Sequence, residues 1–168
     1  METQRLILRK YTKNDLSDFY EYISDPKVVE FEPNKPMTLQ EASDTLEWRL
    51  QSDEFIAVEL KTTHKMIGNI YLGKRDFNSL ELGYVFNSEF WGQGYAFESC
   101  AAITDDAFSK GIHRIYAECD PENANSWKLL ERLGFVREAF FRRNVYFWTD
   151  GEGKPIWKDT FVYSKLNG

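Results

Sequence analysis

The sequence of 168 residues has few cysteines, no long apolar run and no excess of basic residues. Its two cysteines, Cys100 and Cys119, form no CxxC pair and lie near no histidine at metal-binding spacing. We interpret both as buried thiols of a reducing compartment. No run approaches the roughly 18 apolar residues of a membrane span. The start METQRLILRKY lacks the pattern of a signal peptide, so we expect a cytoplasmic protein without a membrane segment.

The charge balance argues against a nucleic-acid partner. The formal net charge is -6 at pH 7, whereas a generic nucleic-acid-binding protein presents a basic face. An acidic surface instead suits a cationic acceptor such as an amine. The apolar share of 42% and the charged share of 29% are ordinary for a globular protein. The length fits a single domain over residues 1–168.

Hydrophobic spacing predicts several strands first, and then helices that alternate with strands. Strands are expected over residues 5–10, 55–60, 66–72, 80–86, 114–119, 135–147 and 157–165. Helices are expected over residues 12–22, 38–51, 95–110 and 125–133. Thr38 with Glu41 forms a capping box at the second helix. This order predicts an α/β fold, with one mixed sheet and helices on both faces.

A glycine-containing loop joins a strand to a helix in the segment LELGYVFNSEFWGQGYAFES, which begins at Leu80. Gly92 and Gly94 permit a tight turn and a close approach to a ligand. The first amides of the following helix favour an anion such as a pyrophosphate. Gln93 offers a further hydrogen bond, and the small Ala96 lets a ligand lie near the helix. The pattern is neither a Walker motif nor the dinucleotide GxGxxG fingerprint, and its alternative interpretation is a plain strand-to-helix turn.

A second segment, CDPENANSWKLLERLGF, runs from Cys119 to Phe135. Asn123 stands where a strand gives way to a helix, so its side chain either caps the helix or binds an amide of a ligand. Ser126 follows three residues later, and its hydroxyl either faces the same site or serves the cap.

Together the two segments resemble the GNAT acetyltransferase superfamily, and most closely its ribosomal-protein N-terminal (alanine and serine) acetyltransferases. The opening ETQRLILRKYTKNDLSDFYEY and the ending WKDTFVYSKL are similar to that subgroup as well, so the resemblance covers nearly the whole chain. It implies a GNAT-type acyl-CoA N-acyltransferase fold, whose mostly antiparallel twisted sheet splays at the cofactor strand. It also implies an enzyme that moves acetyl from acetyl-CoA (coenzyme A) to a primary amine.

The resemblance assigns a cofactor-binding set to this sequence. The strand backbone would pair with the pantetheine arm, the loop amides would hold the pyrophosphate, Asn123 would contact the pantetheine, and Ser126 would lie near the thioester sulfur. The set comprises Tyr84, Val85, Phe86, Trp91, Gly92, Gln93, Gly94, Tyr95, Ala96, Asn123 and Ser126. Two positions depart from the superfamily pattern: Trp91 replaces Gln or Arg, and Leu130 replaces a Tyr that is thought to protonate the departing thiolate. Ser126 is the replacement acid that the motif offers.

An amine must lose its proton before it attacks a thioester. A peptide α-amine has a pKa of about 8 and a lysine amine about 10.4, so an α-amine needs only a modest base. Glu81, on the cofactor strand, is the predicted base; its alternative is a solvated strand residue.

The acceptor expected from the resemblance is a protein or peptide N-terminal α-amine. A polyamine, an aminoglycoside or another small amine is the alternative, because the segments that would line the acceptor site vary in such folds. A protein that binds acetyl-CoA without turnover is a second alternative, and a nucleic-acid-binding module is disfavoured by the net charge of -6. Since such folds often dimerise, we also expect a homodimer.

Overall fold

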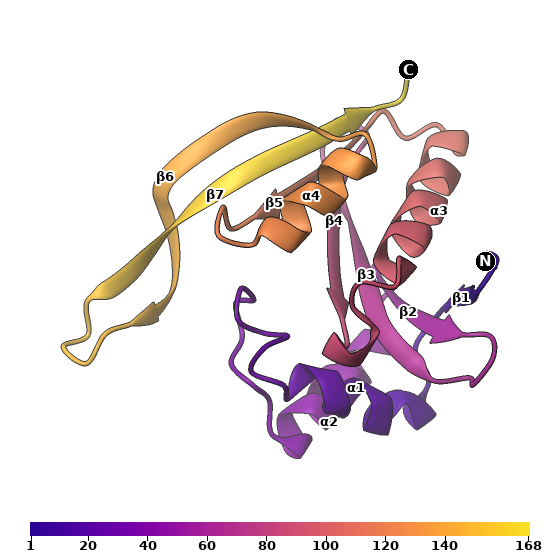
Figure 1. Cartoon of the computed structure of the whole chain (residues 1–168), viewed down its shortest axis with the longest axis horizontal. Coiled ribbons are helices and arrows are strands. Elements are labelled where there is room, and N and C mark those ends of the chain that lie inside the picture. The colour runs from indigo at the N-terminus through magenta and orange to yellow at the C-terminus, as the bar shows by residue number, and fades with distance from the viewer.

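The computed structural model describes residues 1–168 and joins seven strands in one sheet. The strands are β1 (Leu6–Arg9), β2 (Phe55–Leu60), β3 (Met66–Arg75), β4 (Ser79–Phe86), β5 (Arg114–Cys119), β6 (Val136–Thr149) and β7 (Pro155–Leu166). They lie in the order β1-β2-β3-β4-β5-β7-β6 (Figure 1). All neighbours are antiparallel except β4 and β5, which are parallel. The predicted mixed sheet is therefore confirmed.

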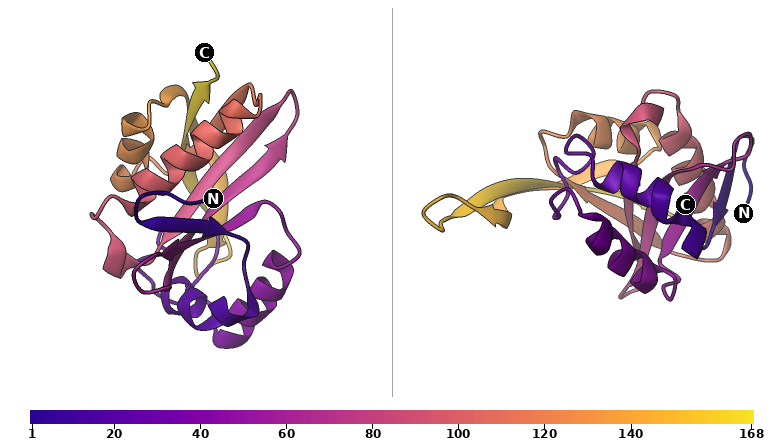
Figure 2. Two further views of the ribbon diagram at one scale, coloured as in Figure 1. Left: turned by 90° about the vertical axis from the view of Figure 1, so that its right-hand side faces the viewer. Right: turned by 90° about the horizontal axis from the view of Figure 1, so that it is seen from below.

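Four helices cover the two faces of this sheet. They are α1 (Leu16–Ile23), α2 (Leu39–Arg49), α3 (Tyr95–Ser109) and α4 (Ala124–Arg132), with single 3-10 turns η1 (Lys13–Asp15) and η2 (Ser88–Phe90). Successive residues of a strand point to opposite faces. Accordingly Val58 packs in the cluster under α3 and α4, whereas Ala57 packs in the cluster under α1 and α2. Figure 2 shows these helix pairs on opposite sides of the sheet, so the prediction of helices on both faces is confirmed.

The start of α2 follows the predicted capping box. The Thr38 hydroxyl accepts from the Glu41 amide at 3.3 Å, and the Glu41 carboxylate accepts from the Thr38 amide at 2.7 Å. Ala42 and Leu46 are buried beneath the helix, as its apolar spacing predicts. Leu39, the first residue of the helix, is 54% exposed.

The sheet opens between β4 and β5. Only Ser79, Leu80 and Glu81 of β4 pair with β5, opposite the segment Arg114–Tyr116. Both strands continue beyond this ladder, to Phe86 and Cys119. Since neither strand has the other as a partner there, the predicted splay is confirmed, and β4 presents free backbone toward the gap.

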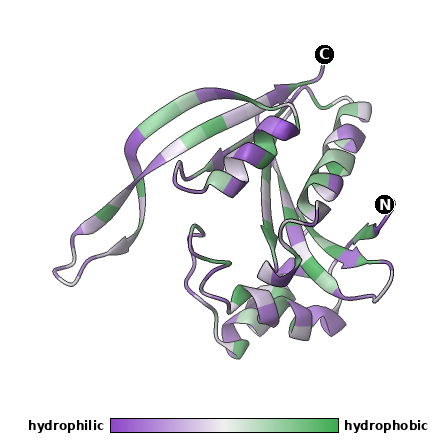
Figure 3. Cartoon of the chain, in the orientation of Figure 1, coloured by the Kyte–Doolittle hydropathy of each residue, from purple (hydrophilic) through white to green (hydrophobic).

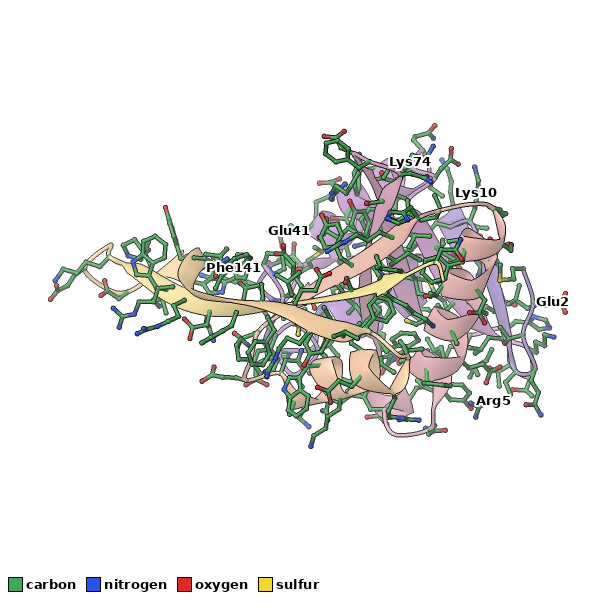
Figure 4. All side chains as sticks on the ribbon, turned by 90° about the horizontal axis from the view of Figure 1, so that it is seen from above. Glu2, Arg5, Lys10, Glu41, Lys74 and Phe141 are labelled. Carbon is green, nitrogen blue, oxygen red and sulfur yellow. The ribbon has the colours of Figure 1, made fainter.

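The β6–β7 hairpin extends well beyond the sheet as an arm, which Figure 2 also shows standing out from the body. Its strands reach Thr149 and Pro155, beyond the ends at 147 and 157 that the sequence predicted. Tyr146 and Trp157 stack edge to face across the strands at 5.2 Å, which extends the ladder. Figure 3 shows apolar residues on both strands of the arm, and Phe141, labelled in Figure 4, is 47% exposed there.

Both cysteines are free. Cys100 is buried, but Cys119 is partly exposed, so the expectation of two buried thiols is half wrong. Cys119 ends β5 at the point where the sheet has opened, which leaves its side chain incompletely covered. None of the helices has the length and apolar character of a membrane span.

Candidate active site

A cavity of about 840 Å³ lies where β4 and β5 part. Its wall is built from the end of β4, the loop before α3, the first turn of α3, one side of α4, and the loop that follows α1. Every residue of the predicted cofactor-binding set lines it: Tyr84, Val85, Phe86, Trp91, Gly92, Gln93, Gly94, Tyr95, Ala96, Asn123 and Ser126. Two segments that are about thirty residues apart in the sequence are thus brought to one site by the sheet.

The loop before α3 presents a row of free amides to this cavity. Gly92 and Gly94 have φ of 73° and 82°, the left-handed region that favours glycine. The first hydrogen bond of the helix runs from the Glu98 amide to the Gly94 carbonyl at 3.0 Å, and none of the amides from Gly92 to Phe97 donates within the chain. Unpartnered amides at the positive end of a helix of 15 residues form an anion site.

The chain's own N-terminal segment braces this loop. Arg5 donates from Nη1 to the Gln93 carbonyl at 3.0 Å and from Nε to Glu98 at 2.7 Å, and its guanidinium lies 4.3 Å from the centre of the Tyr95 ring. Thr3 donates to the same Glu98 carboxylate at 2.6 Å. The sequence pattern contains no signal for this contact, because Arg5 and Gln93 are 88 residues apart.

Two side chains of the loop are used within the loop itself. Trp91 donates from its indole nitrogen to the Phe86 carbonyl at 2.8 Å, which closes the loop over the end of β4. Gln93 donates to the Glu89 carbonyl at 3.2 Å, which leaves the second N–H of its carboxamide for the ligand contact that its position suggested. The loop therefore offers its backbone amides and one side-chain N–H to the cavity.

Two hydroxyls meet across the open part of the sheet. The Tyr84 hydroxyl lies 2.9 Å from the Ser126 hydroxyl and donates to the Ser126 carbonyl at 3.1 Å. Asn123 caps α4, because its side-chain oxygen accepts from the Ser126 amide at 3.2 Å. Burial raises the pKa of Tyr84 far above its usual range, so the phenol keeps its proton. Leu130 is fully buried in the core and contributes no polar group to the cavity.

Glu81 lies outside the cavity wall. Its neighbours Leu80 and Leu82 belong to the core under α3 and α4, so Glu81 points to the opposite face of β4. There its carboxylate forms an ion pair with Arg75, and the Tyr116 hydroxyl lies 3.5 Å away. The structure thus separates the predicted base from the residues of the predicted cofactor set.

Two other carboxylates line the cavity, the exposed Glu30 and the more deeply placed Glu32. Glu32 belongs to the loop between α1 and α2 and is half-buried. Burial raises the pKa of Glu32 to about 7, and the positive charge of Arg49 only partly opposes this effect. Sequence reasoning missed this residue, because it lies in an irregular segment between two proline-containing breaks and matches no motif. No group of three His, Cys, Asp or Glu side chains is placed to hold a metal ion.

Comparison with known proteins gives one family. The model of the acetyltransferase (GNAT) domain matches residues 5–136. The uncharacterized N-acetyltransferase YnaD of Bacillus subtilis is 31% identical, over 98% of this chain and 95% of that protein. The [ribosomal protein uS5]-alanine N-acetyltransferase of Escherichia coli is 37% identical over 84 residues, which are 49% of this chain and 40% of that protein.

Solved structures agree with this fold. An acetyltransferase of the GNAT family from Bacillus anthracis has a TM-score of 0.90 and 28% identity, and the match covers 99% of this chain and 98% of that chain. Spermidine N-acetyltransferase from Vibrio cholerae, in complex with CoA and spermine, has a TM-score of 0.80 and 19% identity, and the match covers 98% and 97%. At that lower identity the likeness concerns the fold alone.

Proposed function

This chain belongs to the GNAT acetyltransferase family and is an N-acetyltransferase, and we propose that it moves the acetyl group of acetyl-CoA to the N-terminal α-amine of a protein or peptide. One observation carries the use of acetyl-CoA by this chain. The free amides from Gly92 to Phe97 lie on one part of the wall of the cavity between β4 and β5. The Tyr84–Ser126 hydroxyl pair lies on another part of the same wall. Free amides and a hydroxyl pair in one cavity of about 840 Å³ fit a ligand with a phosphate-bearing end and a reactive group.

The chain's residues would hold the ligand as follows. The amides from Gly92 to Ala96 would bind the pyrophosphate, and Arg132, which also lines the cavity, would supply a positive charge beside it. The backbone of Tyr84, Val85 and Phe86 would pair with the pantetheine beyond the point where β5 departs. Asn123 would contact the same arm. When bound, acetyl-CoA supplies a thioester, which is an activated acetyl group.

The hydroxyls of Tyr84 and Ser126 would then act on the leaving group. Their mutual hydrogen bond of 2.9 Å fixes both oxygens on the cavity wall. We assign Ser126 the hydrogen bond to the departing sulfur, and Tyr84 the positioning of Ser126. A thiol has a pKa of about 8.5, so it departs with little help from an acid, and the absence of a tyrosine at Leu130 is tolerable. The role of Glu81 as base stays a prediction that Glu81→Gln tests.

Two considerations favour an α-amine acceptor. The relative from Escherichia coli is named for the alanine of a ribosomal protein, and an α-amine, with a pKa of about 8, is partly neutral at pH 7 without a strong base. A polyamine or another small amine is the second candidate, since one fold neighbour is a spermidine acetyltransferase. A binding protein without turnover is the third.

The test measures thiol release from acetyl-CoA by the pure protein. The acceptors are peptides that begin with Ala, Ser or Thr, then spermidine, then an aminoglycoside. Release with the peptides alone supports the proposal, and release with spermidine or the aminoglycoside alone replaces the acceptor class. No release with any acceptor, while acetyl-CoA still raises the melting temperature, favours the binding protein.

A pair of glycine variants tests the cofactor loop itself. Gly94→Ala places a side chain at φ of 82°, with its Cβ 3.4 Å from Arg5 Nη2, so we expect the affinity for acetyl-CoA to fall at least about tenfold. Gly111→Ala is the matched control, because Gly111 has φ of 87° at the other end of α3 and an added Cβ would meet nothing within 4 Å there. Equal affinities for the two variants, measured by calorimetry, would move the pyrophosphate site elsewhere. The cytoplasmic location and the homodimer stay predictions, which cell fractionation and light scattering test.

A further inference from the structure

The loop between α1 and α2 contributes two carboxylates without an ion-pair partner to the cavity wall, the exposed Glu30 and the half-buried Glu32. Three other carboxylates of low exposure are held by cations: the buried Asp15 and Glu59 by Arg9, and the half-buried Glu98 by Arg5. Glu32 has no such ion pair, and only burial and the charge of Arg49 act on it. A carboxylate that is kept unpaired inside a cavity is free to take a proton from what the cavity binds.

The loop fixes this carboxylate in position. Val28 and Val29 are buried in the cluster under α1 and α2, and the Glu32 amide donates to the Val29 carbonyl at 3.0 Å. Phe31 lies beside β7, with its ring centre 5.9 Å from Lys158 Nζ. Glu32 is thus held between the body of the molecule and the start of the arm.

The carboxylate also lies near the predicted reaction point. Burial is the main reason why the pKa of Tyr84 is raised, and the charge of Glu32 adds to it. The two side chains are therefore close enough to interact, and both line the same cavity. Tyr84 contacts Ser126 at 2.9 Å, so Glu32 shares one cavity with the hydroxyl pair.

Arg49 is the cation whose charge lowers the pKa of Glu32, but its hydrogen bonds are made to other side chains. Its Nη1 donates to the Tyr11 hydroxyl at 2.8 Å and to the Asn69 side chain at 3.1 Å, and its guanidinium lies over the Phe55 ring at 4.3 Å. It lowers the pKa of Glu32 less than burial raises it. The charged and titratable groups around Glu32 are Lys27 and Glu30 of its own loop, Arg49 of α2, Tyr84 of β4, Arg132 of α4 and Lys158 of β7.

On the basis of the proposed acetyl transfer, we propose that Glu32 is the base that removes the proton from the acceptor amine. The Glu32 carboxylate takes one proton from the ammonium group, which leaves a neutral amine. The amine nitrogen then attacks the thioester carbon, so a C–N bond forms and the C–S bond breaks. The surplus proton on the new amide nitrogen goes to the departing sulfur, through the Ser126 hydroxyl, and Glu32 later releases its proton to water. The balance is one amide, one free thiol and one proton.

A carboxyl group that titrates near neutral pH suits this step. A general base works best when its pKa lies near the pH at which the enzyme operates. Glu81, in contrast, is held in an ion pair with Arg75 on the other face of β4. Glu32→Gln and Glu81→Gln are therefore expected to differ in their effect on the rate of acetyl transfer.

The experiment compares pH profiles of kcat/KM for the wild type, Glu32→Gln, Glu81→Gln and Glu47→Gln, with an alanine-initiated peptide and with spermidine as acceptors. Glu47 is an exposed residue of α2 whose only ionic contact is 3.6 Å from Lys13, so its variant controls for the loss of one charge. Glu32→Gln is expected to lower kcat/KM at pH 7 by about 10²- to 10⁴-fold and to remove the inflection near pH 7. Glu47→Gln is expected to keep both.

A second readout does not depend on turnover. Carbon-13 NMR of the glutamate carboxyl groups should show one signal that titrates near pH 7 in the wild type and in Glu47→Gln, and that is missing in Glu32→Gln. Wild-type turnover together with an unchanged profile in Glu32→Gln would overturn the assignment and leave the proposed function standing. Loss of the inflection in Glu81→Gln alone would give the role to Glu81. Absence of wild-type turnover with every acceptor would refute the proposed function, and this inference with it.

Discussion

The contact between Glu98 and the N-terminal segment allows a prediction from the geometry of the cofactor loop. The Glu98 carboxylate accepts three hydrogen bonds: from the Thr3 hydroxyl at 2.6 Å, from the Arg5 amide at 2.8 Å and from Arg5 Nε at 2.7 Å. Glu98→Gln keeps one acceptor oxygen but places an NH2 group opposite the Arg5 guanidinium. The variant therefore loses the charge-assisted bond and gains two donors that face each other.

The loss of stability that we expect for Glu98→Gln follows from these contacts. A hydrogen bond to a charged group contributes about 1.5 to 3 kcal/mol, and the Arg5 side chain is 41% exposed, so solvent screening reduces the value to about 1 kcal/mol. For a chain of this size about 1 kcal/mol lowers the melting temperature by about 2 to 4 °C. Because Arg5 also binds the Gln93 carbonyl, we expect weaker binding of acetyl-CoA as well.

The pH dependence of this loss has a definite sign. Burial alone would raise the pKa of Glu98, but hydrogen bonds from Thr3 and Arg5 outweigh it, so the pKa in the folded state is lowered. The stabilisation is then fully present above the unfolded pKa, about 4.3, and is lost as the pH falls through the folded value. The gap between wild type and variant should be full at pH 7 and should close below about pH 4.

Thermal unfolding followed by circular dichroism, at several pH values, measures this gap. Asp106→Asn is the control on the same helix, because the Asp106–Lys110 pair is a surface pair four residues apart and should contribute about 0.5 kcal/mol or less. If Glu98→Gln melts with the wild type at pH 7, or if Asp106→Asn loses as much stability, the brace does not hold the loop and the reasoning fails.

Three further variants test the core, the hydroxyl pair and the buried carboxylate. Leu130→Ala should destabilise the fold by about 2 to 5 kcal/mol in chemical denaturation, because the side chain is fully buried; a smaller loss would mean that the core collapses around the gap. Tyr84→Phe removes the hydroxyl that contacts Ser126 and should lower kcat more than it raises the KM for acetyl-CoA; the opposite split would make the phenol a binding group. Glu32→Gln should be more stable than the wild type at pH 8, by no more than about 4 kcal/mol, because burial raises the pKa of Glu32 to about 7 and the folded state therefore loses stability as the pH rises from about 4.3 to 7. Equal melting temperatures of these two proteins at pH 8, with the same equality at pH 4, would show that the carboxylate is solvated.

Local features of this protein were predictable, since they depend on residues a few positions apart. The Thr38–Glu41 capping box, the left-handed glycines Gly92 and Gly94, and the cap at Asn123 each follow from a short spacing. The strand and helix order follows from hydrophobic periodicity, which reports only on the face that each element buries. Together these features were sufficient to identify the resemblance to the acetyltransferase family and to predict the cofactor-binding set.

Features that join distant segments were not predictable in this way. The direction of Glu81 depends on which face of β4 meets the core, and the ion pair with Arg75 takes it out of the cavity. The length of the arm depends on cross-strand pairs such as Tyr146 with Trp157, which no single strand reveals.

The sequence by itself thus determined the elements, the glycine-containing loop before α3 and the family, because short-range hydrogen bonds and periodic burial depend on neighbouring residues. The tertiary structure alone decided that Arg5 braces the loop and that Glu32, not Glu81, lines the cavity. The reason is physical: the pKa of a carboxyl group is set by the side chains and solvent around it, and the neighbours of Glu32 come from α2 and β4 only after the chain has folded.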